Sequence, residues 1–220
     1  MRNKFDMQLE RLSEQLIFMG SLCEKAIANA TKALRNGDLE LAKLVMSEDE
    51  EIDQIEKDIE RLCLKLLLQQ QPVARDLRQI SAALKMITDM ERIGDQTSDI
   101  AEIIISAGMS EARDISVIGT MAEATSKMVH DSILAYVNKD LEMAQKVMLA
   151  DDEVDRMFEL VKAKLVELIL KDGGKQVEKS IDLIMITKYL ERIGDHATNI
   201  AEWVEFSITG VHKDGQLVER

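Results

Sequence analysis

Residues 91–102 read ERIGDQTSDIAE and residues 191–202 read ERIGDHATNIAE, so one twelve-residue segment occurs twice, one hundred positions apart. The two copies are identical at eight of their twelve positions. Each lies in a long stretch whose apolar residues recur every three or four positions, which predicts an amphipathic helix. A duplicated helical segment predicts a fold assembled from two copies of one helical unit.

A second pair of segments extends the duplication towards the N-terminus. Residues 36–53 (NGDLELAKLVMSEDEEID) align with residues 138–155 (NKDLEMAQKVMLADDEVD) and are identical at ten of eighteen positions. Solenoid proteins repeat every 20–50 residues or so, which is much shorter than this offset. We therefore interpret the chain as a tandem duplication of one small helical domain.

Six long helices are predicted from the apolar periodicity and the few interruptions in it. Gly37 and Asp38 provide a helix stop followed by an N-cap, and Pro72 is tolerated in a first helical turn. The expected helices span residues 3–36, 38–70, 73–106, 111–137, 140–171 and 176–208. Long helices with short turns predict an all-α fold of two tandem three-helix bundles related by pseudo-twofold symmetry. The expected units are a first bundle over 1–108, a second bundle over 109–210 and a polar tail over 211–220.

Composition narrows the class of protein. The net charge is −13, which argues against nucleic-acid binding because that function needs a basic face. The N-terminal segment is charged and amphipathic, unlike a signal peptide, and the apolar runs are too short to span a bilayer. Cys23 and Cys63 have no motif spacing, so we expect buried, reduced thiols. These features predict a cytoplasmic protein.

Two of the predicted helices carry stripes of carboxylates beside their apolar faces. On the third helix, Glu91, Asp95, Asp99 and Glu102 lie within about 80° of one another on a helical wheel. The second helix carries a comparable stripe that includes Asp49 and Asp53. Like charges four residues apart on a helix repel each other, so neither solubility nor helix propensity requires this arrangement.

If the two stripes face each other, a cation is needed to neutralise the converging oxygens. A set of ligands with oxygen and no sulfur suits Mg²⁺, Mn²⁺, Ca²⁺ or iron. The alternative is a solvated acidic face whose exposed ion pairs contribute little to stability. Because the pattern recurs on two helices in each of two copies, we favour metal binding.

Gly94 and Gly194 lie on apolar faces, which indicates close helix packing. We expect Arg92 and Arg192 to pair with neighbouring carboxylates.

The second copy is poorer in acid, because Asn199 stands where the first copy has Asp99. Its remaining candidates are Asp151, Asp155, Glu191 and Asp195. A second site of lower affinity, a site of different nuclearity and no second site all remain open. We interpret His196, which replaces Gln96, as a surface histidine.

The doubled E-R-I-G-D-x-x-x-x-I-A-E segment, together with D-x-x-x-D on the preceding helix, resembles the PhoU family of bacterial phosphate-signalling regulators. The resemblance spans essentially the whole chain. It implies two three-helix bundles whose surface motifs bind multinuclear iron, with manganese, magnesium or zinc as alternatives. The metal ligands that it implies here are Asp49, Asp53, Glu91, Asp95, Asp99, Asp151, Asp155, Glu191 and Asp195. Tyr189, at the position of Asp89, departs from the acidic pattern as Asn199 does.

The resemblance also implies a function. PhoU-like proteins are cytoplasmic, commonly dimeric, and repress the phosphate-starvation response at the membrane-bound phosphate-specific ABC transporter and its sensor histidine kinase. We therefore expect an adaptor without enzymatic turnover that contacts the ATPase subunit of the transporter and the kinase. A metal-dependent hydrolase and a metal-free helical scaffold are the alternatives. A di-iron oxidase is disfavoured, because none of the three histidines follows a glutamate by three residues.

Overall fold

The computed structural model of the chain describes residues 2–70, 72–109 and 116–211, and all regular structure in these ranges is helical. Six α-helices follow one another along the chain, and the predicted all-α class is confirmed. Their bounds are α1 Arg2–Asn36, α2 Leu39–Gln70, α3 Ala74–Ser106, α4 Ser116–Asn138, α5 Leu141–Asp172 and α6 Val177–Thr209.

The turns form where the sequence predicts them. Gly37 has a φ of 64°, and the side chain of Asp38 accepts a hydrogen bond of 3.0 Å from the backbone N–H of Leu41. In the second repeat, Asp140 caps α5 in the same way through Met143 N, also at 3.0 Å. Such N-caps satisfy backbone donors that have no partner inside the helix.

One turn differs between the two repeats. Lys139 stands where the first repeat has Gly37, and it adopts a φ of 55°, the one positive φ among the non-glycine residues that the structure describes. This left-handed conformation costs a residue with a side chain roughly 1–2 kcal/mol. A glycine at this position would avoid that cost.

Predicted helix boundaries agree to within one or two residues for five helices. Helix α3 begins at Ala74 after an N-cap at Val73, one residue later than expected, and Pro72 directly precedes the N-cap. The expected start of the fourth helix at residue 111 lies outside the described residues. The polar tail over 211–220 also falls outside them, apart from Val211.

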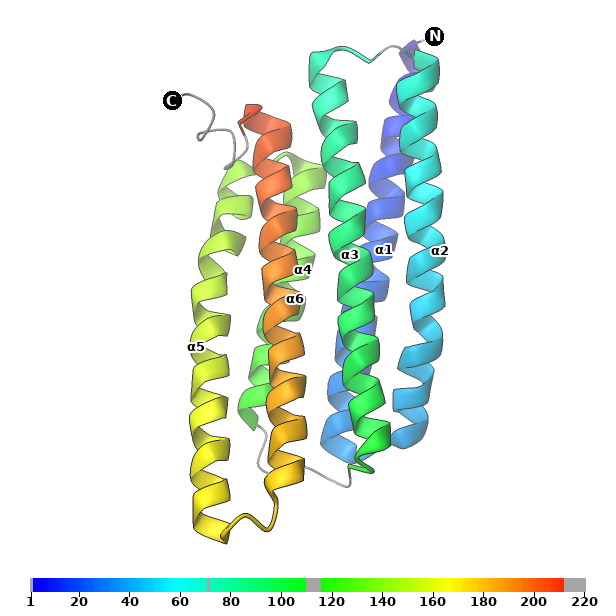
Figure 1. The fold of residues 1–220 in the computed structure, drawn as a ribbon. Helices are drawn as coiled ribbons and strands as arrows, with labels where there is room; N and C mark the ends of the chain where they lie inside the picture. The colour runs from blue at the N-terminus through cyan, green and yellow to red at the C-terminus, as the bar shows by residue number, and fades with distance from the viewer. Residues whose placement is uncertain (1, 71, 110–115, 212–220) are drawn as a thin grey trace.

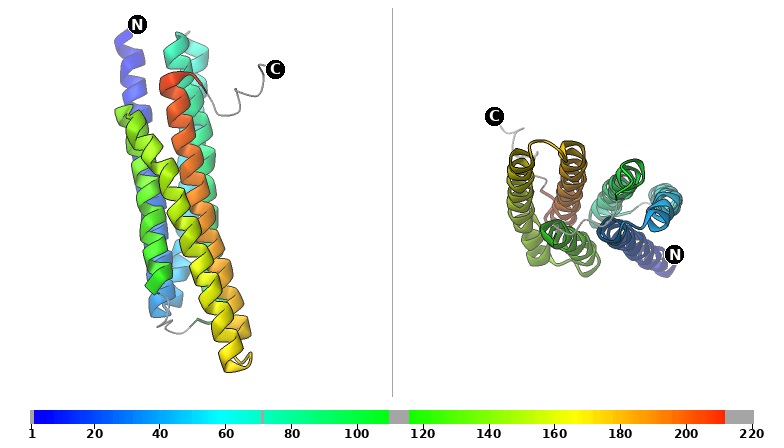
Figure 2. Two further views of the ribbon diagram at one scale, coloured as in Figure 1. Left: turned by 90° about the vertical axis from the view of Figure 1, so that its left-hand side faces the viewer. Right: turned by 90° about the horizontal axis from the view of Figure 1, so that it is seen from below.

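The helices form two three-helix bundles side by side. Helices α1, α2 and α3 pack against one another, as do α4, α5 and α6, and α3·α6 and α1·α4 contacts join the two sets. Figure 1 shows α3 and α6 adjacent at the centre with α2 and α5 outside them, and the end-on view in Figure 2 shows the two triangular bundles. The fold is therefore the predicted pair of bundles with pseudo-twofold symmetry.

One continuous apolar core runs through both bundles, because buried residues of all six helices form a single cluster. Leucine, isoleucine, alanine and methionine fill most of it; Leu16 and Met86, for example, are fully buried. Burying one such large side chain contributes about 1.5–3 kcal/mol to the stability of the fold.

Both cysteines are free and buried, as predicted. Within the described residues, no helix combines the length and apolarity needed to cross a membrane. The division at residue 108 remains a prediction.

Candidate metal centre

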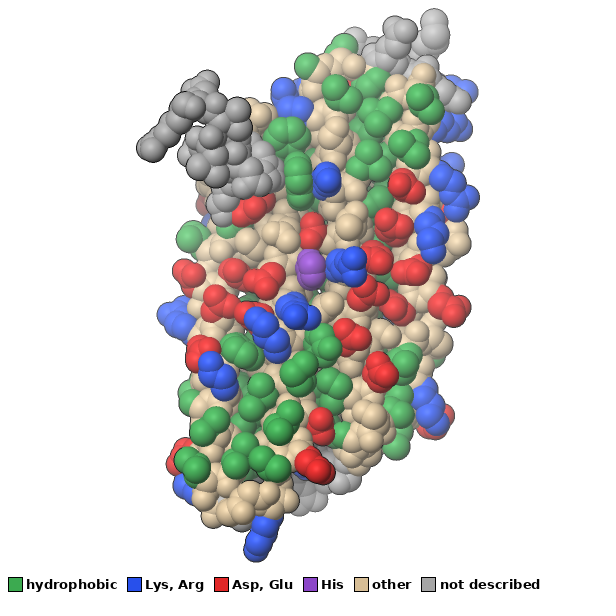
Figure 3. Space-filling model, viewed as in Figure 1, with side chains coloured by type: hydrophobic (Ala, Val, Ile, Leu, Met, Phe, Trp, Pro, Cys, Tyr) green, Lys and Arg blue, Asp and Glu red, His purple; other side chains and the backbone are tan. Residues whose placement is uncertain are grey.

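The first carboxylate cluster lies where α2 packs against α3. Asp49 and Asp53 extend from α2, and Glu91, Asp95 and Asp99 extend from successive turns of α3. All five side chains are partly buried at the edge of the helix–helix contact. The structure thus brings the five predicted residues of the first repeat together. Figure 3 shows acidic side chains gathered at mid-height over α2 and α3, with a second group over α5 and α6.

Asp49 occupies the innermost position of this cluster. Its Oδ1 atom is buried and has no hydrogen-bond partner among the described residues. A Cβ atom on Gly94 would lie 2.6 Å from that oxygen and 3.1 Å from Ile52 Cδ1. Gly94 thus permits close packing, as predicted, and it also leaves space for a carboxylate oxygen, which we had not predicted.

Burial, followed by the negative charges of Asp95, Asp53, Glu91 and Asp99, raises the pKa of Asp49 to about 6. Burial and the charge of Asp95 also raise the pKa of Glu91, although Arg92 opposes this effect. These shifts have one physical cause: like charges share a partly dehydrated surface. A bound cation would reverse this effect by stabilising the ionised carboxylates.

The second cluster repeats this arrangement between α5 and α6. Oδ1 of Asp151 is also buried without a hydrogen-bond partner in the described part of the chain. Burial and the charges of Asp195, Asp155 and Glu191 raise the pKa of Asp151 to about 6. A Cβ on Gly194 would lie 3.3 Å from Asp151 Oδ1, so this contact is looser than that at Gly94. The four predicted residues of the second repeat are therefore also together.

Positive side chains border both clusters. Arg92 lies 3.2 Å from Asp95 and 3.6 Å from Glu91, as predicted for this arginine. Lys188 forms an ion pair with Glu191 in the second cluster. Arg192 differs from its counterpart, because its guanidinium lies over the ring of Tyr189 at 5.8 Å. Burial and the charge of Asp95 raise the pKa of Asp99, and the charge of Arg192 only partly opposes this rise. The expectation that Arg192 pairs with a neighbouring carboxylate is not met by any ion pair of the described residues.

The two clusters fit a hard cation in three respects. Their donors are carboxylate oxygens, each cluster holds one buried oxygen without a partner, and a glycine keeps space beside that oxygen. In the ranges that the structure describes, no three Asp, Glu, His or Cys side chains are arranged closely enough to surround an ion. The nine residues named from the sequence lie in these two clusters, and metal binding by them remains a prediction.

Tyr189 and Asn199, which stand where the first repeat has aspartates, lie at the contact between α3 and α6. Asp89 of α3 accepts a hydrogen bond of 3.1 Å from the amide of Asn199, and its Oδ1 lies 2.9 Å from Nδ1 of His196. Across the pseudo-twofold axis, Tyr189 lies close to Asp99, and burial together with the charge of Asp99 raises the pKa of Tyr189. The departures from the acidic pattern thus complement acids of the first repeat.

Sequence reasoning missed this contact between the repeats and misinterpreted one residue. The His196 side chain is 21% exposed and contacts Asp89 of the other bundle, so it is a partly buried residue of the contact between the bundles and not simply the surface histidine that we expected. A signal was present, because three residues that differ from the first copy, Tyr189, His196 and Asn199, are spaced by seven and three positions on one helix face. When residues that differ between two repeats lie on one face of a helix, that face is indicated as a contact with another part of the protein.

Comparison with known proteins agrees with this architecture. A family model described as the PhoU domain matches residues 16–104 and 118–204. The chain is 37% identical over 215 residues to a phosphate-specific transport system accessory protein PhoU homolog of Clostridium acetobutylicum, covering 97% of this chain and 98% of the relative. A Pseudomonas aeruginosa protein of the same description is 34% identical over 209 residues, with 94% and 86% coverage.

Solved structures show the same fold. The crystal structure of PhoU from Pseudomonas aeruginosa superimposes with a TM-score of 0.87 at 33% identity, covering 94% of this chain and all of that one. The phosphate transport system regulatory protein PhoU from Streptococcus pneumoniae gives a TM-score of 0.84 at 24% identity, which supports the fold alone. With the family model matching both repeats and relatives matching nearly the full length, the chain belongs to the PhoU family.

Proposed function

We propose that this protein is a cytoplasmic regulator of phosphate uptake and a negative regulator of the phosphate-starvation response. In this proposal it is an adaptor between the ATPase subunit of a phosphate-specific ABC transporter and a sensor histidine kinase. The descriptions of its relatives as phosphate-specific transport system accessory proteins support the link to transport. The observation that carries the proposal is the pair of carboxylate clusters at equivalent places in the two repeats, each with one unpartnered buried oxygen.

The adaptor would bind metal at both clusters. Iron in a multinuclear centre is our first candidate, with manganese, magnesium or zinc as alternatives. A bound cation would neutralise the carboxylates and connect α2 to α3 and α5 to α6, since each cluster draws its ligands from two helices. The acidic face over these helices would then have a fixed shape and a reduced negative charge, both of which suit a docking surface.

We propose no catalytic turnover for the protein. Phosphate hydrolysis at a metal centre requires a positioned nucleophile or base in addition to ligands. The polar neighbours of the clusters are engaged otherwise: Arg92 with its two carboxylates, and His196 with Asp89. We also propose that the protein forms a homodimer and associates with the membrane only through its protein partners.

The adaptor function is tested by cross-linking the protein, carrying a tag without histidines, in phosphate-replete cells. We expect the transporter ATPase subunit and a histidine kinase to co-purify from solubilised membranes. The Asp53→Ala/Asp95→Ala variant tests whether recovery depends on the first cluster. Recovery of neither partner with the unaltered protein would overturn the adaptor proposal and would make a screen for metal-dependent hydrolysis the next experiment.

A further inference from the structure

A small cavity lies where the beginning of α3 meets the ends of α4 and α6. Its volume is about 240 Å³, and it is therefore smaller than the roughly 300–1,000 Å³ typical of pockets for drug-sized ligands. Its lining comes from both repeats and consists of Arg75, Gln79, Tyr136, Lys139, Ser207 and Ile208. Two of these six side chains are cationic and none is a carboxylate, although acids outnumber bases 41 to 28 in the chain.

Each cation of the cavity is followed in the sequence by an aspartate, Asp76 or Asp140, and neither aspartate lines the cavity. Within the described residues, neither Arg75 nor Lys139 forms an ion pair, whereas most of the other ion pairs join residues on one helix at three- or four-residue spacing. Arg75 and Lys139 approach the cavity from different helices, since Arg75 lies in the first turn of α3 and Lys139 in the turn between α4 and α5. The cavity thus brings two cationic side chains together beside the C-terminal ends of α4 and α6.

Lys139 is held in an unfavourable backbone conformation. Its φ is 55°, and the equivalent turn of the first repeat has Gly37 with a φ of 64°. Strained residues of this kind cluster at functional sites, where the surrounding structure holds them in place. A lysine at a position suited to glycine indicates that its ammonium group has a role.

The floor of the cavity is rigid and partly polar. Tyr136 is 2% exposed and donates a hydrogen bond of 2.9 Å to the backbone carbonyl of Gln79. Ser207 donates to the carbonyl of Val204 at 2.7 Å, so its hydroxyl oxygen can still accept a hydrogen bond. The donors left for a ligand are the Arg75 guanidinium, the Lys139 ammonium and the side-chain amide of Gln79.

We propose that this cavity binds a small tetrahedral oxyanion and that inorganic phosphate is its ligand. An arginine fork and a lysine form strong charge-assisted hydrogen bonds to phosphate oxygens, and an amide adds a neutral donor. The small volume favours a free anion over a nucleotide or a phosphopeptide. The inference does not depend on the carboxylate clusters or on the adaptor proposal, so either can fail without the other.

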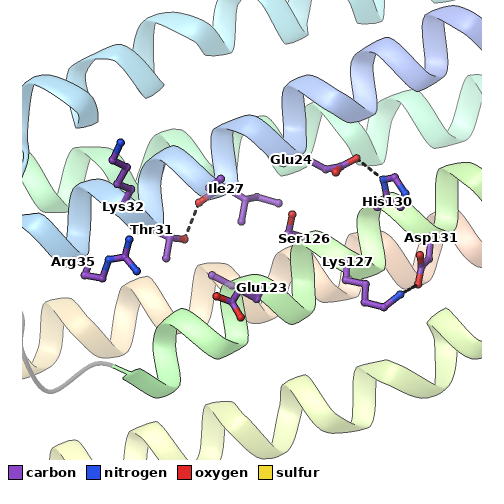
Figure 4. Close-up of a pocket in the computed structure, with 12 residues that line it drawn as sticks. Glu24, Ile27, Thr31, Lys32, Arg35, Glu123, Ser126, Lys127, His130 and Asp131 are labelled. Carbon is purple, nitrogen blue, oxygen red and sulfur yellow. Dashed lines mark hydrogen bonds and ion pairs between the residues drawn. The ribbon is translucent and has the colours of Figure 1, made fainter.

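A larger groove of about 540 Å³ between α1 and α4 provides a comparison. Figure 4 shows Lys32 and Arg35 at one end of it and the Glu24–His130 and Lys127–Asp131 pairs at the other. Because carboxylates line this groove together with its cations, it does not favour an anion. Lys32 and Arg35 supply a matched pair of cations for a control.

The competing explanation is that Arg75 and Lys139 only balance the negative ends of α4 and α6. The Lys139→Gly variant separates the two explanations. Glycine relieves the left-handed strain, so the variant should be at least as stable as the unaltered protein without phosphate. If the lysine binds phosphate, the same variant should lose the stabilisation that phosphate provides.

The experiment measures melting temperature and calorimetric binding during titration with sodium phosphate at constant ionic strength. We expect a saturable increase in melting temperature for the unaltered protein and at least about tenfold weaker binding for Arg75→Gln and Lys139→Gly. The Lys32→Gln/Arg35→Gln control should respond as the unaltered protein does. Sulfate should bind more weakly than phosphate, and so should AMP and phosphoserine.

Three results would overturn the proposal: no saturable response, a full response in Lys139→Gly, or equal losses in the control variant. Tighter binding of sulfate or of either phosphate ester would overturn the assignment to free phosphate.

Discussion

Gly94 faces Asp49 so closely that a Cβ atom on Gly94 would lie 2.6 Å from the Asp49 Oδ1 atom, a distance that real Cβ atoms essentially never show. The equivalent distance between Gly194 and Asp151 Oδ1 is 3.3 Å. This difference supplies a matched pair of substitutions. In both repeats the glycine lies in the interior of a helix, where alanine would be favoured by about 1 kcal/mol.

Gly94→Ala should move the carboxylate of Asp49 and reduce metal binding by the first cluster. Because the helix-propensity gain offsets the steric conflict, the net change in unfolding free energy should be within about 1 kcal/mol. Gly194→Ala should leave metal content nearly unchanged and stabilise the protein slightly. Elemental analysis and urea unfolding of both variants provide the check, and equal metal content in the two would show that Gly94 does not protect the site.

Gly94→Leu tests packing more severely. The larger side chain meets Ile52 as well as Asp49, and overpacking of this kind costs on the order of 1–3 kcal/mol. We expect a lower melting temperature with retained helical circular dichroism. An unaltered melting temperature would contradict the close contact between α2 and α3.

Asp53→Ala/Asp95→Ala should remove metal from the first cluster while the helices remain intact. The two carboxylates come from different helices, and neither belongs to the apolar core. Metal per chain, measured after purification without a polyhistidine tag, should fall in this variant. Asp58→Ala/Asp131→Ala is the control, because it removes two acids that pair with Arg61 and Lys127 outside the clusters. Unchanged metal stoichiometry in the first variant would refute the site.

The metal-free protein should lose stability as the pH rises towards neutrality. The pKa of Asp49 is raised from 3.8 to about 6, so the folded state binds this proton more tightly than the unfolded state does. The resulting stabilisation is complete below the unfolded-state pKa and is lost as the pH passes through about 6. The side chain is only partly buried, so solvent screening limits its contribution to on the order of 1 kcal/mol.

Asp49→Asn isolates this contribution from that of the other titrating groups. The variant carries no charge at this position, so its stability relative to the unaltered protein should increase between about pH 4 and pH 7. Urea unfolding of the metal-free proteins at both pH values measures the difference. A difference that does not depend on pH would exclude the raised pKa.

Asn199→Asp should weaken the contact between the repeats. The change replaces the amide donor to Asp89 by a second carboxylate, which costs on the order of 1–2 kcal/mol through a lost hydrogen bond and like-charge repulsion. Adding Asp89→Asn to the same chain restores one amide and one carboxylate and should recover most of the stability. Additive losses in the double variant would show that the two residues do not interact.

Sequence patterns predicted the fold well because the relevant signals are local. Gly37 and Asp38 determine where α1 ends and α2 begins, and apolar spacing determines which face of each helix is buried. The nine carboxylates were assigned to two clusters from spacing and from the family resemblance, and the packing of α2 on α3 and of α5 on α6 brings them together. Helical spacing identified the stripe on each helix, and the resemblance supplied the pairing of stripes from neighbouring helices.

Contacts between the repeats were not predictable in the same way. Asp89 and His196 are 107 positions apart, and the helical wheel of α6 does not identify which residue of α3 it contacts. The cavity beside Lys139 combines the beginning of one helix with the ends of two others, so no local pattern indicates it. The backbone strain of Lys139 becomes visible only in three dimensions.

The contact between α3 and α6 has a consequence for the history of the chain. In two separate copies related by strict symmetry, position 89 of each copy would face position 99 of the other, and both contacts would have to consist of the same residues. Fusion of the copies into one gene removes that requirement. Asp89 with Asn199 and Tyr189 with Asp99 are unlike pairs, and two identical copies in a symmetric pair could not form both. Each half of the chain can therefore change its own side of this contact independently of the other half.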